Sequence, residues 1–275
     1  MSAEVRDSAA GFRNVPVGEL PGSIEGQLNA SVDLPVPPVA LAVGAHPDDI
    51  EFGCGATLAK WAAQGCRIHH LVLTDGSKGT WDPSADTADL VKVRKEEQIA
   101  AAQVLGGGDV SFLEITDGEL SSDLETRRRV CEVIRRVRPQ VLLGHDPWRR
   151  YRLHPDHRHA GWLVTDGLVA ARDPKFFPGS GEPHRPLHLL LWEADQPDHV
   201  EEVSAYAATK IAALLAHASQ HLSTMGIKAT AAPDGDHARR EQTDAFADRV
   251  RSRLAEHGKL AGVAAGEAFH RMDHT

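Results

Sequence analysis

Short apolar runs alternate with longer amphipathic stretches from residue 39 onward. The run VALAV at 39–43 predicts a buried strand, and the stretch at 53–64 predicts a helix that ends before Gly65. A second apolar run at 68–73 predicts the next strand. Strands that alternate with helices in this way are typical of βαβ units, in which neighbouring strands run parallel.

The alternation continues through the middle of the chain. The predicted elements are a helix over 88–105, a strand over 110–113, a helix over 122–137 and a strand over 141–143. The run Gly106-Gly107-Gly108 ends the first of these helices, and Pro139 ends the second. The pattern therefore predicts an α/β fold with a mostly parallel sheet flanked by helices in a single domain.

The ends of the chain are less regular. We predict an N-terminal leader over 1–37 and one domain over 38–275. The Pro- and Gly-rich stretch 172–186 predicts a loop long enough to shape a substrate pocket, and 224–236 predicts another loop. The remaining predicted elements are a strand over 187–192 and helices over 203–219 and 243–257.

Composition excludes several classes of protein. The 275 residues include 30 Lys and Arg against 39 Asp and Glu, a net charge of −9, which disfavours nucleic-acid binding. There is no apolar run long enough for a transmembrane helix and no signal-peptide pattern, so we expect a cytoplasmic protein. Three cysteines without CxxC spacing predict neither a disulfide framework nor a thiolate metal cluster.

Sixteen histidines are present, and two groups of them follow predicted strands. The first group is His46-Pro47-Asp48-Asp49, immediately after the strand at 39–43. The second is His154-Pro155-Asp156-His157, about ten residues after the strand at 141–143. Loops beyond the carboxyl ends of parallel strands line the ligand crevice of an open sheet, so both groups can face one site. If Pro155 opens a helix, His154 and His157 share one of its faces.

Two histidines and one carboxylate are a sufficient ligand set for a catalytic zinc, with a fourth position left for water. We predict His46, Asp49 and His157 as the ligands, although Fe²⁺ or Co²⁺ would accept the same set. Asp48 is then free to act as general base. His154 could stabilise an oxyanion or protonate a leaving group, and Asp156 could accept the free ring N–H of a ligating histidine.

Each motif also has a structural interpretation. A single His-Pro-Asp-Asp can be a turn that caps a helix. Two such groups, each following an apolar strand, favour a metal site. His69 and His70 lie inside a predicted strand and are expected to be structural, whereas His145 lies near the crevice and could touch substrate.

At these two motifs the sequence resembles the LmbE/PIG-L-like family of zinc-dependent N-deacetylases. Weaker similarity extends from about residue 38 through most of the chain, and includes the segments Leu73-Thr74-Asp75-Gly76, His217-Ala218-Ser219-Gln220 and Glu267-Ala268-Phe269. The resemblance implies a Rossmann-like fold and the same roles for His46, Asp48, Asp49, His154 and His157. It also implies that Arg94 and Asp117 contact the sugar. Two positions before the first histidine of the second motif, some members of the family carry a tyrosine. This sequence has Arg152 at that position, and Tyr151 is adjacent.

The resemblance implies a hydrolase that removes an N-acetyl or short N-acyl group from an N-acetylglucosamine unit of a small molecule or natural-product glycoside, such as an antibiotic intermediate. The alternatives are an amidase for a thiol conjugate or a glucosamine-inositol thiol precursor, and a non-catalytic sugar-binding protein with the same fold. An esterase or phosphate-ester hydrolase is a further alternative, because a zinc-activated water is not selective by itself. The expected partner is a small amino-sugar substrate, and the sequence does not fix the oligomeric state.

Overall fold

The computed structural model of the chain describes residues 30–228 and 235–273. The strands are β1 (Ser31–Val32), β2 (Val39–Gly44), β3 (Arg67–Thr74), β4 (Asp109–Ile115), β5 (Val141–His145), β6 (His188–Trp192), β7 (His199–Glu202) and β8 (Gly266–Asp273). The helices are α1 (Asp49–Ala63), α2 (Thr87–Val104), α3 (Leu124–Val137), α4 (Pro155–Arg172), α5 (Ala207–Leu215) and α6 (Gly235–Lys259), with short 3-10 or π turns at Ser204–Tyr206, Ala218–Gln220 and His221–Met225.

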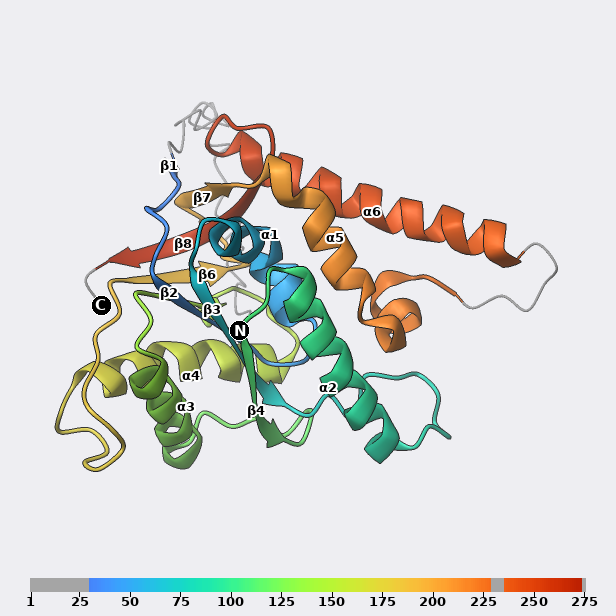
Figure 1. Cartoon of the computed structure of the whole chain (residues 1–275). Helices are drawn as coiled ribbons and strands as arrows, with labels where there is room; N and C mark the ends of the chain where they lie inside the picture. Colours follow the sequence, from blue (N-terminus) through green and yellow to red (C-terminus); the bar gives the residue numbers. More distant parts are fainter. Residues whose placement is uncertain (1–29, 229–234, 274–275) are drawn as a thin grey trace, which may run out of the picture.

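The strands form one eight-stranded sheet in the order β1-β7-β8-β6-β5-β2-β3-β4 (Figure 1). β8 runs antiparallel to both of its neighbours, β6 and β7, and the other neighbouring pairs are parallel. Helices cover both faces of the sheet. The predicted fold class, a single α/β domain with a mostly parallel sheet, is therefore confirmed.

The two faces of the sheet follow from the alternation of side chains along β2. Leu41 and Val43 point into a core shared with α3 and α4. Ala40 and Ala42 point to the opposite face, into a core shared with α1. Because alternate strand residues face opposite sides, the continuous apolar run predicted a strand covered on both faces.

Several element boundaries differ from the prediction. α1 begins at Asp49, four residues before the predicted start at 53, so Asp49 belongs to its first turn. The single helix predicted over 203–219 is wrong, because the chain there forms α5 between two 3-10 turns. α6 is longer than predicted and begins inside the loop expected over 224–236, of which residues 229–234 lie outside the described part.

Two stretches expected to be irregular pack onto the domain. Ser31 and Val32, within the predicted leader, form β1 and pair with β7. The loop over 172–186 lies on the α3–α4 side, where the buried Arg135 donates hydrogen bonds to carbonyl oxygens of this loop and of the end of α4. This loop lines no part of the cavity that holds the histidine motifs, contrary to the expectation that it shapes a substrate pocket.

Helix α1 is interrupted at Cys54, which has non-helical φ and ψ. The carbonyl of Phe52, which Ala56 N–H would otherwise reach, instead accepts a hydrogen bond of 2.7 Å from Lys210 Nζ. The N–H groups of Ala56 and Thr57 donate to the Glu267 carboxylate at 3.1 and 2.7 Å. Lys210 and Glu267 also pair with each other at 2.5 Å. A buried ion pair thus replaces part of the helical hydrogen bonding and ties α1 to α5 and β8.

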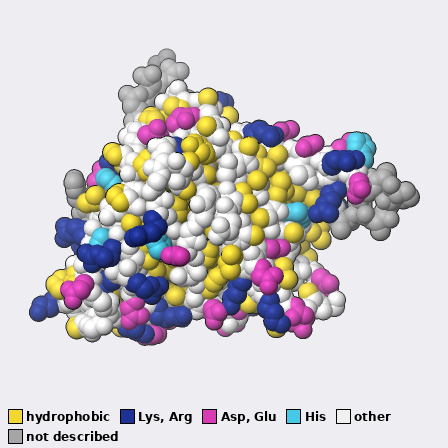
Figure 2. Space-filling view, viewed as in Figure 1, with side chains coloured by type: hydrophobic (Ala, Val, Ile, Leu, Met, Phe, Trp, Pro, Cys, Tyr) yellow, Lys and Arg dark blue, Asp and Glu magenta, His cyan; other side chains and the backbone are white. Residues whose placement is uncertain are grey.

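Charged side chains are distributed unevenly over the face of the molecule shown in Figure 2. On the face shown in Figure 2, acidic and basic side chains lie mostly around the periphery, and the middle of the face is largely uncharged. Among the helices within 30–228 and 235–273, none combines the length and the apolar composition needed to cross a bilayer.

Candidate metal centre and its cavity

The sheet topology brings the two histidine motifs together. The first motif follows β2 and leads into α1, and the second lies at the start of α4, after β5. β2 and β5 are neighbouring parallel strands, so their carboxyl ends meet at one edge of the sheet. α4 begins at Pro155, as predicted, and the rings of His154 and His157 stack 4.7 Å apart on one face of that helix.

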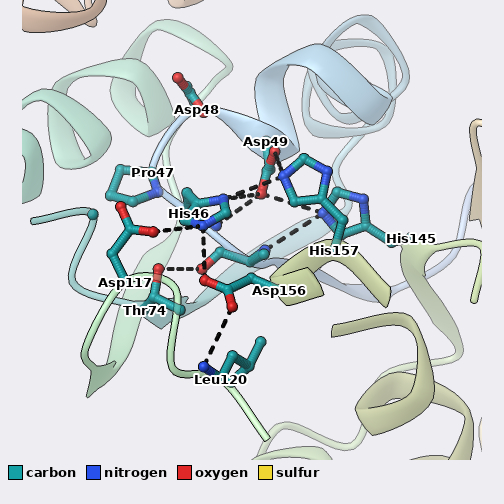
Figure 3. Close-up of polar contacts among 12 residues, drawn as sticks. His46, Pro47, Asp48, Asp49, Thr74, Asp117, Leu120, His145, Asp156 and His157 are labelled. Atoms are coloured by element: carbon teal, nitrogen blue, oxygen red, sulfur yellow. Dashed lines mark hydrogen bonds and ion pairs between the residues drawn. The ribbon is translucent and has the colours of Figure 1, made fainter. Parts of the chain in front are cut away.

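The three predicted ligands converge on one point (Figure 3). His46 Nδ1 lies 3.3 Å from Asp49 Oδ2, and His157 Nε2 lies 3.3 Å from Asp49 Oδ1. The two imidazole nitrogens are 3.2 Å apart. Donors on a tetrahedral zinc with bonds of about 2.0–2.1 Å are separated by about 3.3 Å, so this donor set fits a divalent ion.

The other nitrogen of His46 is held by carboxylates. Nε2 lies 3.1 Å from Asp156 Oδ2 and 3.2 Å from Asp117 Oδ1. Asp156 is fully buried and fixed by the backbone N–H of Gly118 and Leu120. Burial alone would lower the pKa of His46, but these carboxylates and Asp49 raise it well above its usual value. In the neutral ring the arrangement places the remaining proton on Nε2 and leaves Nδ1 as the ligand atom, as metal-binding histidines commonly require.

His145 packs behind this group. Its Nδ1 accepts a hydrogen bond of 3.0 Å from Trp192 Nε1, an indole nitrogen that can only donate. The neutral ring therefore carries its proton on Nε2, which lies 3.2 Å from Asp49 Oδ2. His145 thus donates to Asp49 and orients it. Sequence reasoning placed His145 near the crevice but gave no signal for this contact with Asp49.

Arg152 lies on the far side of His157. Its side chain is 7% exposed, pairs with Glu193, and contacts Nδ1 of both His157 and His145. Tyr151, by contrast, is 92% exposed. A guanidinium only donates, so the contact assigns the His157 lone pair to Nδ1. Binding of a cation by Nε2 requires the ring proton to move from Nε2 to Nδ1, and therefore the contact between Arg152 and His157 to open.

Asp48 is directed away from the ligand group (Figure 3). It adopts a left-handed backbone conformation with φ of 101°, and its N–H donates to Gln98 Oε1 at 3.0 Å. Positive φ in a non-glycine residue is strained and common at functional sites. The two adjacent carboxylates therefore separate: Asp49 faces the histidines, and Asp48 lies 3.5 Å from Arg94. Burial raises the pKa of Asp48 to about 6, against the lowering effect of Arg94.

His154 faces the cavity and is exposed, with its ring edge-on to His46 at 4.7 Å. Burial and the neighbouring His46 lower its pKa below the usual value. The ring is thus placed beside the three predicted ligands, where it can contact a substrate without blocking them.

Arg94 and Asp117 also reach the site, but both have protein partners. Arg94 is 3% exposed and donates to the carbonyls of Gly76 and Pro47 at 2.9 and 2.5 Å. Asp117 contacts His46 and accepts from Lys78 N–H at 3.1 Å. Arg94 therefore fixes the loop that carries Asp48, and Asp117 helps to orient His46.

These residues line a cavity of about 550 Å³. The predicted residues on its wall are His46, Asp48, Asp49, Arg94, Asp117, His154 and His157. Asp156 lies behind His46. The cavity also extends to α6 and to Lys210 and Glu267, which periodicity could not associate with the histidine motifs.

A second buried group supports the Asp48 loop. Gln98, which accepts from Asp48 N–H, also donates to Glu51 Oε1 at 2.8 Å. The other oxygen of Glu51 lies 3.3 Å from His217 Nε2, and both side chains are fully buried. His217 therefore packs behind the site.

An α/β sheet with two histidine–aspartate motifs at adjacent strand ends defines a candidate metal-dependent enzyme. Residues 41–167 match the family described as "PIG-L: GlcNAc-PI de-N-acetylase". The chain is 34% identical over 184 residues to diacetylchitobiose deacetylase of Thermococcus kodakarensis, a match that covers 66% of this chain and 69% of the relative. This protein belongs to the PIG-L family, as its sequence motifs predicted.

Solved structures agree on the fold. The chain is similar to N,N'-diacetylchitobiose deacetylase from Pyrococcus horikoshii, with a TM-score of 0.75 and 25% identity over 86% of this chain and 84% of that one. Another relative, 4-oxalmesaconate hydratase of Pseudomonas putida, is 31% identical over 199 residues, covering 66% of this chain and 73% of the relative. Family membership alone therefore does not fix the reaction, and the site must decide it.

Proposed function

We propose that this protein is a metal-dependent hydrolase that removes the N-acetyl group from an N-acetylglucosamine unit of a small molecule. The observation that carries the proposal is the convergence of His46 Nδ1, Asp49 and His157 Nε2 at separations of 3.2 to 3.3 Å, with the second carboxylate, Asp48, outside this ligand group. The relatives named as deacetylases support the choice of an amide substrate.

His46, Asp49 and His157 would hold the ion, with zinc as the proposed metal. A bound divalent ion would polarise the amide carbonyl and lower the pKa of a water molecule. Asp156 contacts Nε2 of His46, the ring nitrogen that faces away from the convergence point, and His145 contacts Oδ2 of Asp49. These contacts would keep His46 and Asp49 oriented as ligands.

Asp48 takes the proton from the attacking water as oxygen adds to the amide carbon. A carboxylate that is buried in the cavity wall and held by Arg94 is suited to this role. The N–H of the neutral His154 ring donates a hydrogen bond to the oxyanion, and the proton that Asp48 has taken passes to the nitrogen. The carbon–nitrogen bond then breaks, which yields acetate and the free amine. Arg94 orients Asp48, and Asp117 orients His46. Direct contact of Arg94 and Asp117 with the sugar is a further part of the proposal.

Release of amine from N,N'-diacetylchitobiose tests this function. The purified protein should release acetate, lose that activity with a chelator, and regain it when Zn²⁺ is added back. Preferred hydrolysis of an oxygen ester would favour the esterase alternative. Hydration of 4-oxalmesaconate without any amide hydrolysis would contradict the proposal and favour the activity named for the Pseudomonas relative.

A further inference from the structure

The cavity continues well beyond the candidate metal centre. Its far wall is formed by the C-terminal half of α6, whose residues Phe246, Arg249, Val250, Arg253, Leu254 and His257 line it. Clefts of roughly 300–1,000 Å³ enclose drug-sized ligands, and this cavity measures about 550 Å³. The part of the cavity that lies along α6, the α6 arm, therefore offers room for a group attached to the acetamido sugar.

The wall residues of α6 form two adjacent stripes. Phe246, Val250 and Leu254 recur every four residues and are buried, which makes an apolar stripe. Arg249, Arg253 and His257 recur with the same spacing, and Arg249 and Arg253 stand one position before Val250 and Leu254, which makes a polar stripe. One wall of the arm thus offers an apolar surface beside a row of hydrogen-bond donors.

Within residues 30–228 and 235–273, no buried acid pairs with the cations of the polar stripe. Arg249 Nη2 donates to the Met225 carbonyl at 2.6 Å, and its guanidinium lies 5.6 Å from the centre of the Phe246 ring. Arg253 approaches Glu256 only at 3.8 Å, with both side chains more than 60% exposed. An exposed ion pair of this kind contributes little to stability, so both guanidinium groups retain their capacity to bind an anion.

The other charged groups on this arm behave differently. Lys210 is already paired with Glu267 at 2.5 Å and adds no net charge. His257 Nδ1 accepts the N–H of Ala268 at 3.3 Å, so the neutral ring carries its proton on Nε2. The acidic residues Asp48, Asp49 and Asp117 lie at the catalytic end instead. Arg94 also lies at that end and offsets the charge of Asp48, so the cavity is more basic toward α6 than at the catalytic end.

We propose that the α6 arm binds an aglycone that carries an anionic group on an apolar or aromatic body. Arg249 and Arg253 would bind the anion, and Phe246, Val250 and Leu254 would pack against the apolar part. This inference rests on the proposed deacetylation and names the class of substrate: an acidic glycoside of N-acetylglucosamine, rather than the free sugar or a neutral oligosaccharide.

The test uses two probes that differ only in charge, the para-carboxyphenyl β-glycoside of N-acetylglucosamine and its neutral para-carboxamide analogue. We expect the wild type to show a KM for the carboxylate about tenfold below that for the carboxamide. In Arg249→Gln/Arg253→Gln this preference should vanish. Arg251→Gln is the matched control, because Arg251 lies on the same helix, pairs with Asp248 at 2.8 Å and does not line the cavity; it should keep the preference.

Binding of the two deacetylated products, measured by calorimetry, separates this inference from the proposed function. A preference for the carboxylate product that is lost in the double variant supports the arm even if neither probe is hydrolysed, a result that would overturn the deacetylase proposal alone. Equal KM and equal product affinity for both probes in the wild type overturn the arm and leave deacetylation intact. A preference that persists in the double variant also overturns it.

Discussion

His157 Nε2 lies 3.2 Å from His46 Nδ1, although 111 residues separate the two histidines in the chain. Two imidazole nitrogens at this distance share Asp49 as a common neighbour. Parallel pairing of β2 with β5 creates this proximity, because it aligns the strand ends from which the two motifs depart. The candidate ligand group of His46, Asp49 and His157 therefore depends on the strand order of the sheet as well as on the two sequence motifs.

Replacement of the two adjacent carboxylates should separate catalysis from metal binding. Asp48→Asn should retain the metal and lower kcat by about 10²–10⁴-fold, because the base is lost while the fold of the turn is kept. Asp49→Asn is the matched control and should lose the metal as well. Steady-state kinetics together with metal content distinguish them. Full turnover by Asp48→Asn would remove Asp48 from the mechanism.

Arg152→Gln should strengthen metal binding. The Arg152 guanidinium contacts Nδ1 of His157, so its positive charge opposes a cation at Nε2 of the same ring. A neutral amide can accept from the ring N–H instead, and we expect the affinity for Zn²⁺ to rise about tenfold. Competition with a chromophoric chelator measures the change. Weaker zinc binding by the variant would show that Arg152 supports the loaded site.

The sequence predicted the part of the site that local pattern encodes. The apolar run before His46 and the Pro155 that opens α4 determined which side chains stand at the strand ends, and the structure places them there. Residues that act through distant partners carried no such signal. Trp192 orients His145, and Glu267 completes the hydrogen bonds of α1, only because β6 and β8 lie beside these elements in the folded sheet.

Fold prediction failed where periodicity was weak. β8 mixes polar and apolar residues without a sustained apolar run, and it pairs antiparallel between β6 and β7, so nothing in the βαβ pattern predicted it. The stretch at 203–219 does contain helix formers. Its division into α5 and 3-10 turns depends on packing against α1 and α2, which local propensity does not include.

His70 is expected to make stability depend on pH. Its ring is 1% exposed, and neither nitrogen has a hydrogen-bond partner among the residues that the structure describes. Burial lowers its pKa below 6.5, although the charge of Glu51 opposes this. Because the pKa of His70 is lower in the folded chain than in the unfolded chain, the unfolded chain binds the proton first as the pH falls below about 6.5. The free energy of unfolding is therefore expected to decrease as the pH falls through this range.

His70→Leu should raise the free energy of unfolding by about 1 kcal/mol at pH 7.5 and by more at pH 5.5. His70→Gln removes the titration but keeps a buried polar group, so it should reduce the pH dependence without the gain at pH 7.5. Urea unfolding at both pH values measures these differences. An unchanged pH dependence in both variants would exclude His70 as its source.

The Lys210–Glu267 pair should be strongly coupled. Lys210→Met leaves the Glu267 carboxylate buried without its cation and should destabilise the fold by about 3–5 kcal/mol. Adding Glu267→Gln should recover part of that loss, because no unpaired charge remains. A double-mutant cycle from urea unfolding gives the interaction free energy. Additive effects of the two substitutions would show that the pair does not stabilise the break in α1.

The metal content of the purified protein and of its histidine variants tests the central claim most directly. The wild type supplied with Zn²⁺ should bind one ion per chain, and anomalous scattering should place that ion between His46, Asp49 and His157. His46→Ala and His157→Ala should each lose the ion and the activity together, whereas a variant of the outward-facing Tyr151, such as Tyr151→Phe, should keep both. A wild-type protein that hydrolyses the amide with no ion at this position would contradict the account.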